Sequence, residues 1–289
     1  MKDDPEKNFM EWTDDRINRF WEFFSSYKTF NDFYFTKQVG KNIIKFLKLT
    51  VPLRGRILDY GCGLGYLSEC LLSNGISCEG IDTSKNSVNH VNEQFKKNPL
   101  WKGARLLEGS VLPYPDNAFD LIICVEVLEH LPSEKVQSLL QEFHRILKPG
   151  TGYLFITTPF SEDLKLRCVY CPECNHLFHP MQHLNSFNTE ELSSLLSINS
   201  FSGILCNITD FNSIDQIVYP KNLPASQWSY EYLKTRVRDN LLDFYESVRS
   251  SSEYPKSPHR FLRCIGKGPH LVWIGAKVLP DQITNKNIG

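Results

Sequence analysis

The sequence lacks long hydrophobic runs and has almost no net charge. Its 289 residues contain no run of about 18 apolar residues, which a membrane-spanning helix needs, and no apolar signal-peptide core follows residues 1–7. We therefore predict a cytoplasmic protein without a membrane span. A formal net charge of −1 also provides no overall basic field of the kind that attracts nucleic acids or anionic membranes.

The sequence also lacks the even number of cysteines that a disulfide framework uses. Nine cysteines in a chain of this length fit free thiols or metal ligands in a reducing compartment better. Hydrophobic residues make up 41% and charged residues 22% of the chain, without internal repeats or low-complexity segments. This composition is that of an ordinary globular protein with one substantial core plus additions.

Two familiar phosphate-binding fingerprints are absent from the glycine-rich segment 56–66. That segment predicts a short apolar strand, a turn with Gly61, Gly63 and Gly65, and then a helix. The dinucleotide fingerprint needs a glycine where Tyr66 stands, and a P-loop needs Gly-Lys-Ser/Thr after the turn. Alternate glycines nevertheless allow positive φ angles and let backbone N–H groups approach a ligand closely. We therefore predict a ligand site at this turn, the alternative being a tight strand–helix connection without a ligand.

An acidic residue accompanies this turn on each side. Asp59 precedes the first glycine by two positions, and Asp82 follows a second predicted strand at 77–81. This pattern resembles motif I and the following acid of the class I S-adenosylmethionine-dependent methyltransferases. In that family the glycine turn passes under the methionine part of the cofactor, and the acid accepts charge-assisted hydrogen bonds from the ribose hydroxyls. The resemblance implies a cofactor site made of Asp59, Gly61, Cys62, Gly63, Gly65, Asp82 and Thr83.

The rest of the chain continues the resemblance. Alternating strands and helices predict an α/β fold with a doubly wound, seven-stranded Rossmann-like sheet. The fourth strand is continuously apolar, as expected of a strand buried on both faces of a parallel sheet. The resemblance adds Ser110, Val111 and Glu126 to the cofactor site, with Ser110 in place of the acid that usually binds adenine. The later strands are predicted at 104–108, 121–125, 153–157, 201–208 and 271–277.

The predicted methyltransferase domain at 51–278 is preceded by a helical cap at 1–50 and followed by a tail at 279–289. Apolar residues recur at helical spacing in the cap, which is either a layer packed on the sheet or a lid over the cofactor. Insertions are predicted at 160–186 and at 209–268, the second with a helical pattern. Basic residues near its end form either a patch for an anionic acceptor or a solvated face: Arg260, Arg263, Lys267 and His270.

The run Glu126-Val-Leu-Glu-His130 follows the fourth predicted strand, at the carboxyl edge where open α/β sheets bind ligands. In one interpretation Glu126 orients the cofactor loop, while Glu129 and His130 cap the next helix. In another, His130 is the catalytic base and Glu126 orients cofactor or acceptor, since histidine is the side chain that ordinarily titrates near neutral pH.

A third interpretation of this run is a divalent metal site. Similar Glu-x-x-Glu-His runs provide metal ligands in the small-RNA 2′-O-methyltransferases and in ubiquinone-pathway O-methyltransferases. The resemblance implies Glu126, Glu129 and His130 as ligands of Mg²⁺ or Mn²⁺. In the RNA enzymes a later histidine completes the site, and His183 is its counterpart here.

Residues 168–183 contain three cysteines and three histidines. Cys171-x2-Cys174 and His179-x3-His183 each have zinc-ligand spacing, and the mixture of sulfur and imidazole favours zinc over other metals. We predict a structural zinc ion on these four residues, with Cys168 or His176 as substitute ligands. A redox cysteine pair and a cysteine-rich loop without metal are the alternatives. In each case the insertion is expected to flank the acceptor side of the site.

Three classes of function follow from these observations. Neutral charge and single-domain size favour methyl transfer to a small-molecule or glycan-pathway acceptor, with oxygen as the expected atom. The Glu-Glu-His run and the cysteine knuckle favour an RNA or protein methyltransferase, although residues 125–127 read Val-Glu-Val where base amino-methyltransferases carry Asp/Asn-Pro-Pro-Tyr. A cofactor-binding module without catalysis is the third class. The acceptor and the oligomeric state stay open.

Overall fold

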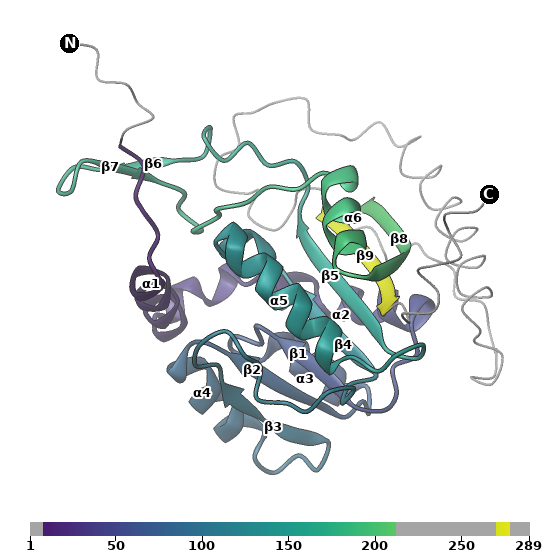
Figure 1. Cartoon of the computed structure of the whole chain (residues 1–289). Helices are drawn as coiled ribbons and strands as arrows, with labels where there is room; N and C mark the ends of the chain where they lie inside the picture. The colour runs from purple at the N-terminus through teal and green to yellow at the C-terminus, as the bar shows by residue number, and fades with distance from the viewer. Residues whose placement is uncertain (1–7, 212–269, 278–289) are drawn as a thin grey trace, which may run out of the picture.

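A mixed seven-stranded sheet forms the centre of the protein (Figure 1). A computed structural model of the chain describes residues 8–211 and 270–277. The strand order is β3-β2-β1-β4-β5-β9-β8, with β1 to β5 parallel and β9 antiparallel to both of its neighbours. The strands are β1 (Ile57–Tyr60), β2 (Cys78–Asp82), β3 (Trp101–Leu106), β4 (Leu121–Val125), β5 (Tyr153–Pro159), β8 (Phe201–Thr209) and β9 (His270–Lys277).

The order of the strands reverses at β1, which pairs with β2 on one side and β4 on the other. Leu58 lies opposite Ile122, and Asp59 lies opposite Gly80. Parallel strands in this register end at the same edge, so the turns after β1, β2 and β4 meet there. Ligands of open α/β sheets bind at such a switch point. The predicted doubly wound α/β sheet is confirmed.

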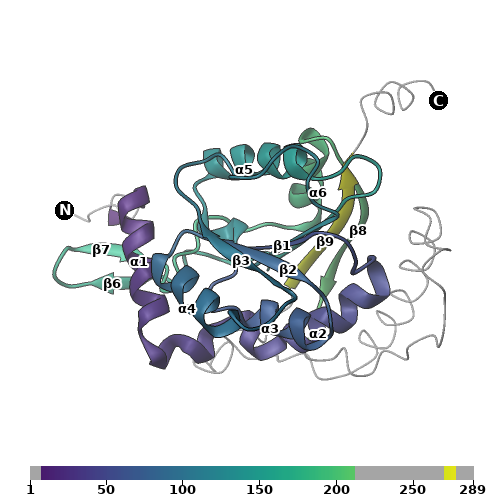
Figure 2. The same ribbon diagram turned by 90° about the horizontal axis from the view of Figure 1, so that it is seen from below.

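Helices cover both faces of this sheet (Figure 2). Figure 2 shows α5 and α6 above the sheet and α2, α3 and α4 below it, while α1 lies at one end. Two hydrophobic cores result, one on each face. The helices are α1 (Asp14–Ser26), α2 (Phe35–Thr50), α3 (Tyr66–Ser73), α4 (Lys85–Phe95), α5 (Ser133–Ile146) and α6 (Thr189–Ile198), with short 3₁₀ helices η2 (Lys28–Phe33) and η3 (Leu128–His130).

Strand β4 shows why the sequence gives this layering. All five of its side chains are buried. Leu121 and Ile123 belong to the core beneath α2 and α3, whereas Ile122 and Cys124 belong to the core beneath α5. Successive side chains of a strand point to opposite faces, so a strand covered on both sides must be apolar at every position.

The N-terminal residues form α1 and α2, as the sequence predicts. Helix α2 packs into the core through residues such as Val39 and Ile43. Helix α1 is capped by Thr13, whose side chain accepts a hydrogen bond from Arg16 N at 3.4 Å. Its aromatic residues contact one another rather than the sheet core, and Trp21 lies 5.3 Å from Phe24 between ring centroids.

The insertion after β5 contains a two-stranded antiparallel hairpin of β6 (Val169–Cys171) and β7 (His176–Phe178). The hairpin and α1 lie at the same end of the molecule (Figures 1 and 2). Met10 N donates to Leu177 O at 2.8 Å, and Trp12 meets Phe178 edge to face at 6.4 Å. The insertion is thereby attached to the N-terminal segment.

The observed boundaries correct some of the predicted ones. Strand β3 begins at Trp101, three residues before the predicted start, because Trp101 pairs with Cys78 and a register shift follows near Gly103, which has a φ of 93°. Helix α6 is capped by Asn188, and Glu191 completes a capping box. Most of the predicted insertion at 209–268, with Arg260, Arg263 and Lys267, and all of the predicted tail at 279–289 lie outside the described residues. No helix in the described part is long and apolar enough to cross a membrane.

Candidate active site

The glycine turn joins β1 to α3 with three left-handed residues. Gly61, Gly63 and Gly65 have φ angles of 71°, 51° and 80°, and Gly65 is the N-cap of α3. Close packing also requires glycine at this turn. A Cβ on Gly61 would lie 2.6 Å from Val127 Cγ2, and one on Gly63 would lie 3.0 Å from Tyr34 Cε1. The turn is therefore held tightly between the start of α2 and the segment after β4.

Asp82 ends β2 beside this turn and bonds to it. Its Oδ2 accepts a hydrogen bond from Gly63 N, and its Oδ1 accepts one from Ser84 N, each at 2.8 Å. Burial raises the pKa of Asp82, and these backbone donors oppose that rise. Each carboxylate oxygen keeps a lone pair, so Asp82 can still accept hydrogen bonds from two hydroxyl groups. This geometry fits the ribose of the predicted cofactor.

The other predicted cofactor residues occupy different environments. Asp59 is buried in β1, where Ser68 Oγ donates to it at 2.6 Å and burial raises its pKa to about 7. Cys62 is buried in the core beneath α2 and α3, and its N–H donates to Ile81 O at 3.1 Å. Thr83, Ser110 and Val111 are exposed. Their role in cofactor binding stays a prediction.

The N-terminal segment covers the glycine turn. Ser84 Oγ donates to Glu22 Oε2 at 2.7 Å and lies 3.0 Å from Ser25 Oγ, so α1 is tied to the start of α4. Tyr34 lies against Gly63, with its ring centroid 5.3 Å from that of Phe24. Tyr34, the N-cap of α2, thus lies against the turn, and Phe24 of α1 packs behind Tyr34.

Glu126 follows β4 in a strained conformation. Its φ is 52°, which is uncommon for a residue with a side chain and often marks a functional site. Thr157 Oγ1 donates to Glu126 Oε1 at 2.7 Å, and His270 Nε2 lies 3.4 Å from Oε2. The ring of His270 stacks on Phe35 at 4.1 Å. These contacts direct Glu126 toward β5 and β9.

The sequence placed His270 in a basic patch, whereas the structure buries it with Glu126. Its side chain is 7% exposed. The signal that was missed is topological. Because β9 runs antiparallel, its first residue lies at the edge where the parallel strands end.

Glu129, His130 and His183 converge, with one potential ligand atom from each within 4.8 Å of the others. Glu129 is 1% exposed, and neither carboxyl oxygen makes a hydrogen bond of normal geometry, although the Thr158 side chain lies close enough to lower its pKa slightly. His130 Nε2 lies 3.7 Å from Glu129 Oε1. Burial raises the pKa of Glu129 well above its usual range and lowers that of His130 well below it. A carboxylate in this position is costly unless a cation accompanies it.

This group does not cap the next helix, since the N-cap of α5 is Pro132. The backbone instead binds the end of the insertion. Glu129 O accepts hydrogen bonds from Leu184 N at 2.6 Å and Asn185 N at 3.1 Å, and Gln182 Nε2 donates to His130 O at 2.8 Å. These bonds bring His183 beside η3. Of the implied ligands, Glu129, His130 and His183 meet, whereas Glu126 lies outside their group.

The structure divides the four predicted zinc ligands between two places. His179 and His183 lie with Glu162, in the second cluster of possible metal ligands among the described residues. Cys171 and Cys174 lie on the β6–β7 hairpin and belong to neither cluster. Hydrogen bonds from Cys174 lower the pKa of the Cys171 thiol. The two cysteines therefore lie close to each other on the hairpin, whereas the two histidines contact Glu162.

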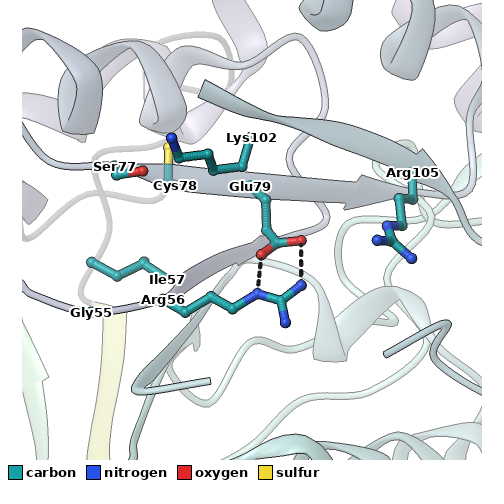
Figure 3. A pocket seen from close by; sticks show the side chains of 8 residues that line it. All are labelled: Gly55, Arg56, Ile57, Ser77, Cys78, Glu79, Lys102 and Arg105. Carbon is teal, nitrogen blue, oxygen red and sulfur yellow. Dashed lines mark hydrogen bonds and ion pairs between the residues drawn. The ribbon is translucent and has the colours of Figure 1, made fainter. Parts of the chain in front are cut away.

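A pocket of about 400 Å³ lies elsewhere, at the amino edge of β1, β2 and β3 (Figure 3). Its centre is an ion pair, in which Arg56 Nε and Nη2 donate to Glu79 at 2.5 Å and 3.1 Å. The polar groups of this pair are hydrogen-bonded to each other. The glycine turn lies at the opposite edge of the sheet. We assign no role to this pocket.

The profile of the methyltransferase-domain family matches residues 31–202. The ubiquinone biosynthesis O-methyltransferase of Coxiella burnetii is 31% identical over 116 residues, which are 40% of this chain and 48% of that protein. The mitochondrial ubiquinone biosynthesis O-methyltransferase of Saccharomyces cerevisiae is 32% identical over 139 residues, which are 46% of this chain and 43% of that protein. The chain thus spans about half the length of the curated relatives it matches.

A solved S-adenosylmethionine-dependent methyltransferase from Methanosarcina mazei is similar in structure, with a TM-score of 0.51 and 20% identity. The similarity covers 81% of this chain and 97% of that one. At this identity the similarity concerns the fold, and it agrees with the sheet described above.

Proposed function

The chain belongs to the class I S-adenosylmethionine-dependent methyltransferases, and from this premise we propose that it methylates a hydroxyl oxygen of a small molecule with the help of a divalent cation. One observation carries the proposal. Glu129 is a buried carboxylate without a hydrogen-bond partner, beside two imidazoles, at the sheet edge that holds the glycine turn. Such a group is suited to hold a cation next to the bound cofactor.

The donor set indicates which cation to expect. Of the two ions that the resemblance implies, Mn²⁺ suits one carboxylate and two imidazoles better, because Mg²⁺ prefers oxygen ligands throughout. Burial keeps His130 neutral, and a neutral imidazole is the form that binds a metal. The residues that would hold the ion are Glu129, His130 and His183, while Glu126 would support the turn after β4 through Thr157.

The cofactor, when bound, supplies a methyl group on a positively charged sulfur, and the ion would make the acceptor hydroxyl easier to deprotonate. The chain has the task of alignment. The glycine turn and Asp82 hold the cofactor, and α1 with Tyr34 excludes water from above the turn. In the alternative without a metal, His130 removes the hydroxyl proton itself. Either route places the chemistry at the end of β4.

The relatives support oxygen as the atom that is methylated. Two of those named above are O-methyltransferases of ubiquinone biosynthesis, and none of them is named for a glycan. We therefore propose a phenolic or other small-molecule hydroxyl. The second candidate is a ribose 2′-hydroxyl of RNA. It is favoured by one observation, that His183 joins Glu129 and His130 as the resemblance to the small-RNA enzymes implies.

The test uses the full chain, S-adenosylmethionine with a labelled methyl group, and two acceptor panels, catechols and short oligoribonucleotides. We expect labelled catechol ether in the presence of Mn²⁺, little product with a chelator, and loss of the metal response in Glu129→Gln. Glu134→Gln, an exposed carboxylate in the first turn of α5, is the matched control. If the rate of methyl transfer is unchanged both by the chelator and by Glu129→Gln, the cation has no part in the reaction. If only the oligoribonucleotides are labelled, the second candidate is favoured.

A further inference from the structure

Glu162 lies three residues after β5 and is hydrogen-bonded to His183. His183 belongs to the insertion and is also one of the three proposed metal ligands. We propose that Glu162 is a positioning residue: it accepts the hydrogen of His183 Nδ1 and so reserves the Nε2 lone pair of His183 for the site of Glu129 and His130. This inference rests on the proposed function. It gives a role to a carboxylate that the sequence did not single out.

The contacts of Glu162 show that it acts as a hydrogen-bond acceptor. Its Oε2 is hydrogen-bonded to His183 Nδ1, and its Oε1 lies 3.2 Å from Arg167 Nη1 and 3.5 Å from His179 Nε2. The side chain is 6% exposed. The guanidinium of Arg167 pairs with Glu162, and a carboxylate paired in this way can only accept hydrogen bonds.

The tautomer of His183 follows from that bond. A carboxylate acceptor requires a hydrogen on Nδ1, so the neutral ring carries its lone pair on Nε2. The ring of His183 lies 4.9 Å from that of His130, between centroids. A ligand histidine commonly donates its other N–H to a carboxylate, which fixes the ring and raises the basicity of the ligand nitrogen.

His179 supports this arrangement from the same insertion. Its Nδ1 faces the backbone N–H groups of Met181 and His183 at 3.4 Å and 3.3 Å, so Nδ1 is the acceptor and Nε2 carries the hydrogen. That hydrogen faces Glu162. The rings of His179 and His183 stack at 4.4 Å. His179 therefore orients Glu162 and His183 rather than offering a lone pair to a second ion.

The positive charge of Arg167 also argues against a second cation beside Glu162. At 3.2 Å it already neutralises the carboxylate, and a metal ion there would be repelled by the guanidinium. The backbone fixes Glu162 in place as well. Ser161 has a φ of 45°, and its N–H donates to Phe187 O at 2.9 Å. The segment that enters the insertion is thus tied to the one that leaves it.

The first test measures the tautomer directly, in metal-free protein. The full chain is labelled with ¹⁵N in histidine, and the His183 ring signals are assigned by their loss in His183→Asn. We expect a hydrogen on Nδ1 in the wild type and a shift of the population toward Nε2–H in Glu162→Ala. Glu162→Gln keeps an acceptor oxygen, so it should shift the population less. A wild-type ring with its hydrogen on Nε2, or no change in either variant, would overturn the inference.

The second test measures affinity for Mn²⁺ by titration followed with electron paramagnetic resonance. We expect Glu162→Ala to weaken binding by about 10–100-fold, the usual loss when a carboxylate behind a ligand histidine is removed, and Glu162→Gln to weaken it less. Glu173→Gln, an exposed carboxylate of the same insertion, is the matched control and should bind like the wild type. Calorimetric titration with S-adenosylmethionine should show equal affinity in all four proteins.

The two proposals fail in different ways. A wild-type chain that binds no Mn²⁺ but keeps the Nδ1–H tautomer contradicts the proposed cation and supports the role of Glu162 toward His183. If Glu162→Ala binds Mn²⁺ as tightly as the wild type, the proposed role of Glu162 is wrong, whereas the proposed cation site is still supported.

Discussion

The two edges of the parallel strands differ in whether their ionisable side chains have partners. At the amino edge Arg56 pairs with Glu79, and Lys148 pairs with Asp120 at 2.8 Å. At the carboxyl edge Glu129 is buried without any hydrogen-bond partner. Charges that pair with each other serve the fold. A buried carboxyl group such as Glu129 holds its proton, as its raised pKa indicates, unless a cation from outside the chain joins it.

This comparison distinguishes the functional edge better than the presence of a hollow does. The pocket in Figure 3 lies at the amino edge, but its ion pair satisfies itself. The carboxyl edge is covered by α1 and Tyr34 and holds the glycines, Asp82 and the unpaired carboxylate. At the functional edge the unsatisfied carboxyl group of Glu129 therefore indicates a ligand better than the hollow at the amino edge does.

Among variants that test the contrast between the two sheet edges, His130→Ala should have the largest effect, and this effect is on catalysis. His130→Ala should lower kcat by about 10²–10⁴-fold, the range for losing a group that acts on the transferred proton, and leave cofactor affinity unchanged. His90→Ala, on an exposed surface of α4, is the matched control. Kinetics with and without Mn²⁺ would separate a ligand from a base. Full activity of His130→Ala would contradict both roles.

The second prediction concerns pH and Asp59, which burial shifts from an ordinary pKa of 3.8 to about 7. Between these values the folded chain holds a proton that the unfolded chain releases. The free energy of unfolding should therefore fall as pH rises through this window, by a total on the order of 4 kcal/mol. Asp59→Asn should remove this dependence. Urea unfolding of cofactor-free protein from pH 4 to pH 8 measures it, and parallel curves for the two proteins would contradict it.

The third prediction concerns Asp82, at the carboxyl end of β2. Asp82→Ala should weaken binding of S-adenosylmethionine by about 1.5–3 kcal/mol, because hydrogen bonds to a charged group are lost. The Gly63 and Ser84 N–H groups lose their acceptor in the same variant. Calorimetric titration measures the change, and unchanged affinity would exclude Asp82 from the cofactor site.

The smallest effect is expected at the amino edge of the sheet, where Arg56, just before β1, pairs with Glu79 of β2. Arg56→Ala removes the partner of Glu79, whose side chain is 6% exposed, and should lower the free energy of unfolding by about 1–2 kcal/mol. Cofactor affinity should not change. The double variant Arg56→Met, Glu79→Leu should recover most of the stability, because no charge is left unpaired. A loss of cofactor affinity in Arg56→Ala would break the contrast between the two edges.

The parts of the site that the sequence predicts are those encoded by local spacing. The glycine turn and Asp82 lie on consecutive strand ends, and a strand–turn–helix pattern is sufficient to bring them together. The apolar run of β4 likewise predicts a buried central strand. The predicted start of β3 was wrong because the strand begins its pairing at Trp101, which lies outside the strand pattern visible in the sequence.

The rest depends on contacts between residues far apart in the chain. Glu162 has no motif of its own, and its role arises only when the insertion folds His183 back onto it. His270 lies beside Glu126 because the last strand is antiparallel, which residue spacing does not reveal. The zinc spacing of Cys171, Cys174, His179 and His183 is present in the sequence, but the hairpin and Glu162 separate the two pairs.

The attachment of α1 has a consequence for the order in which the protein folds during synthesis. Trp21 Nε1 donates to Gln182 Oε1 at 2.8 Å, and the two residues are 161 positions apart. At a synthesis rate of about 5–20 residues per second, Gln182 emerges roughly 8–30 s after Trp21. The aromatic face of α1 lacks this partner for that time. The helix is therefore made before β1 to β5 and completes its docking only after these strands have been synthesised. A ribosome-bound chain that ends before Gln182 should therefore expose this face to chaperones.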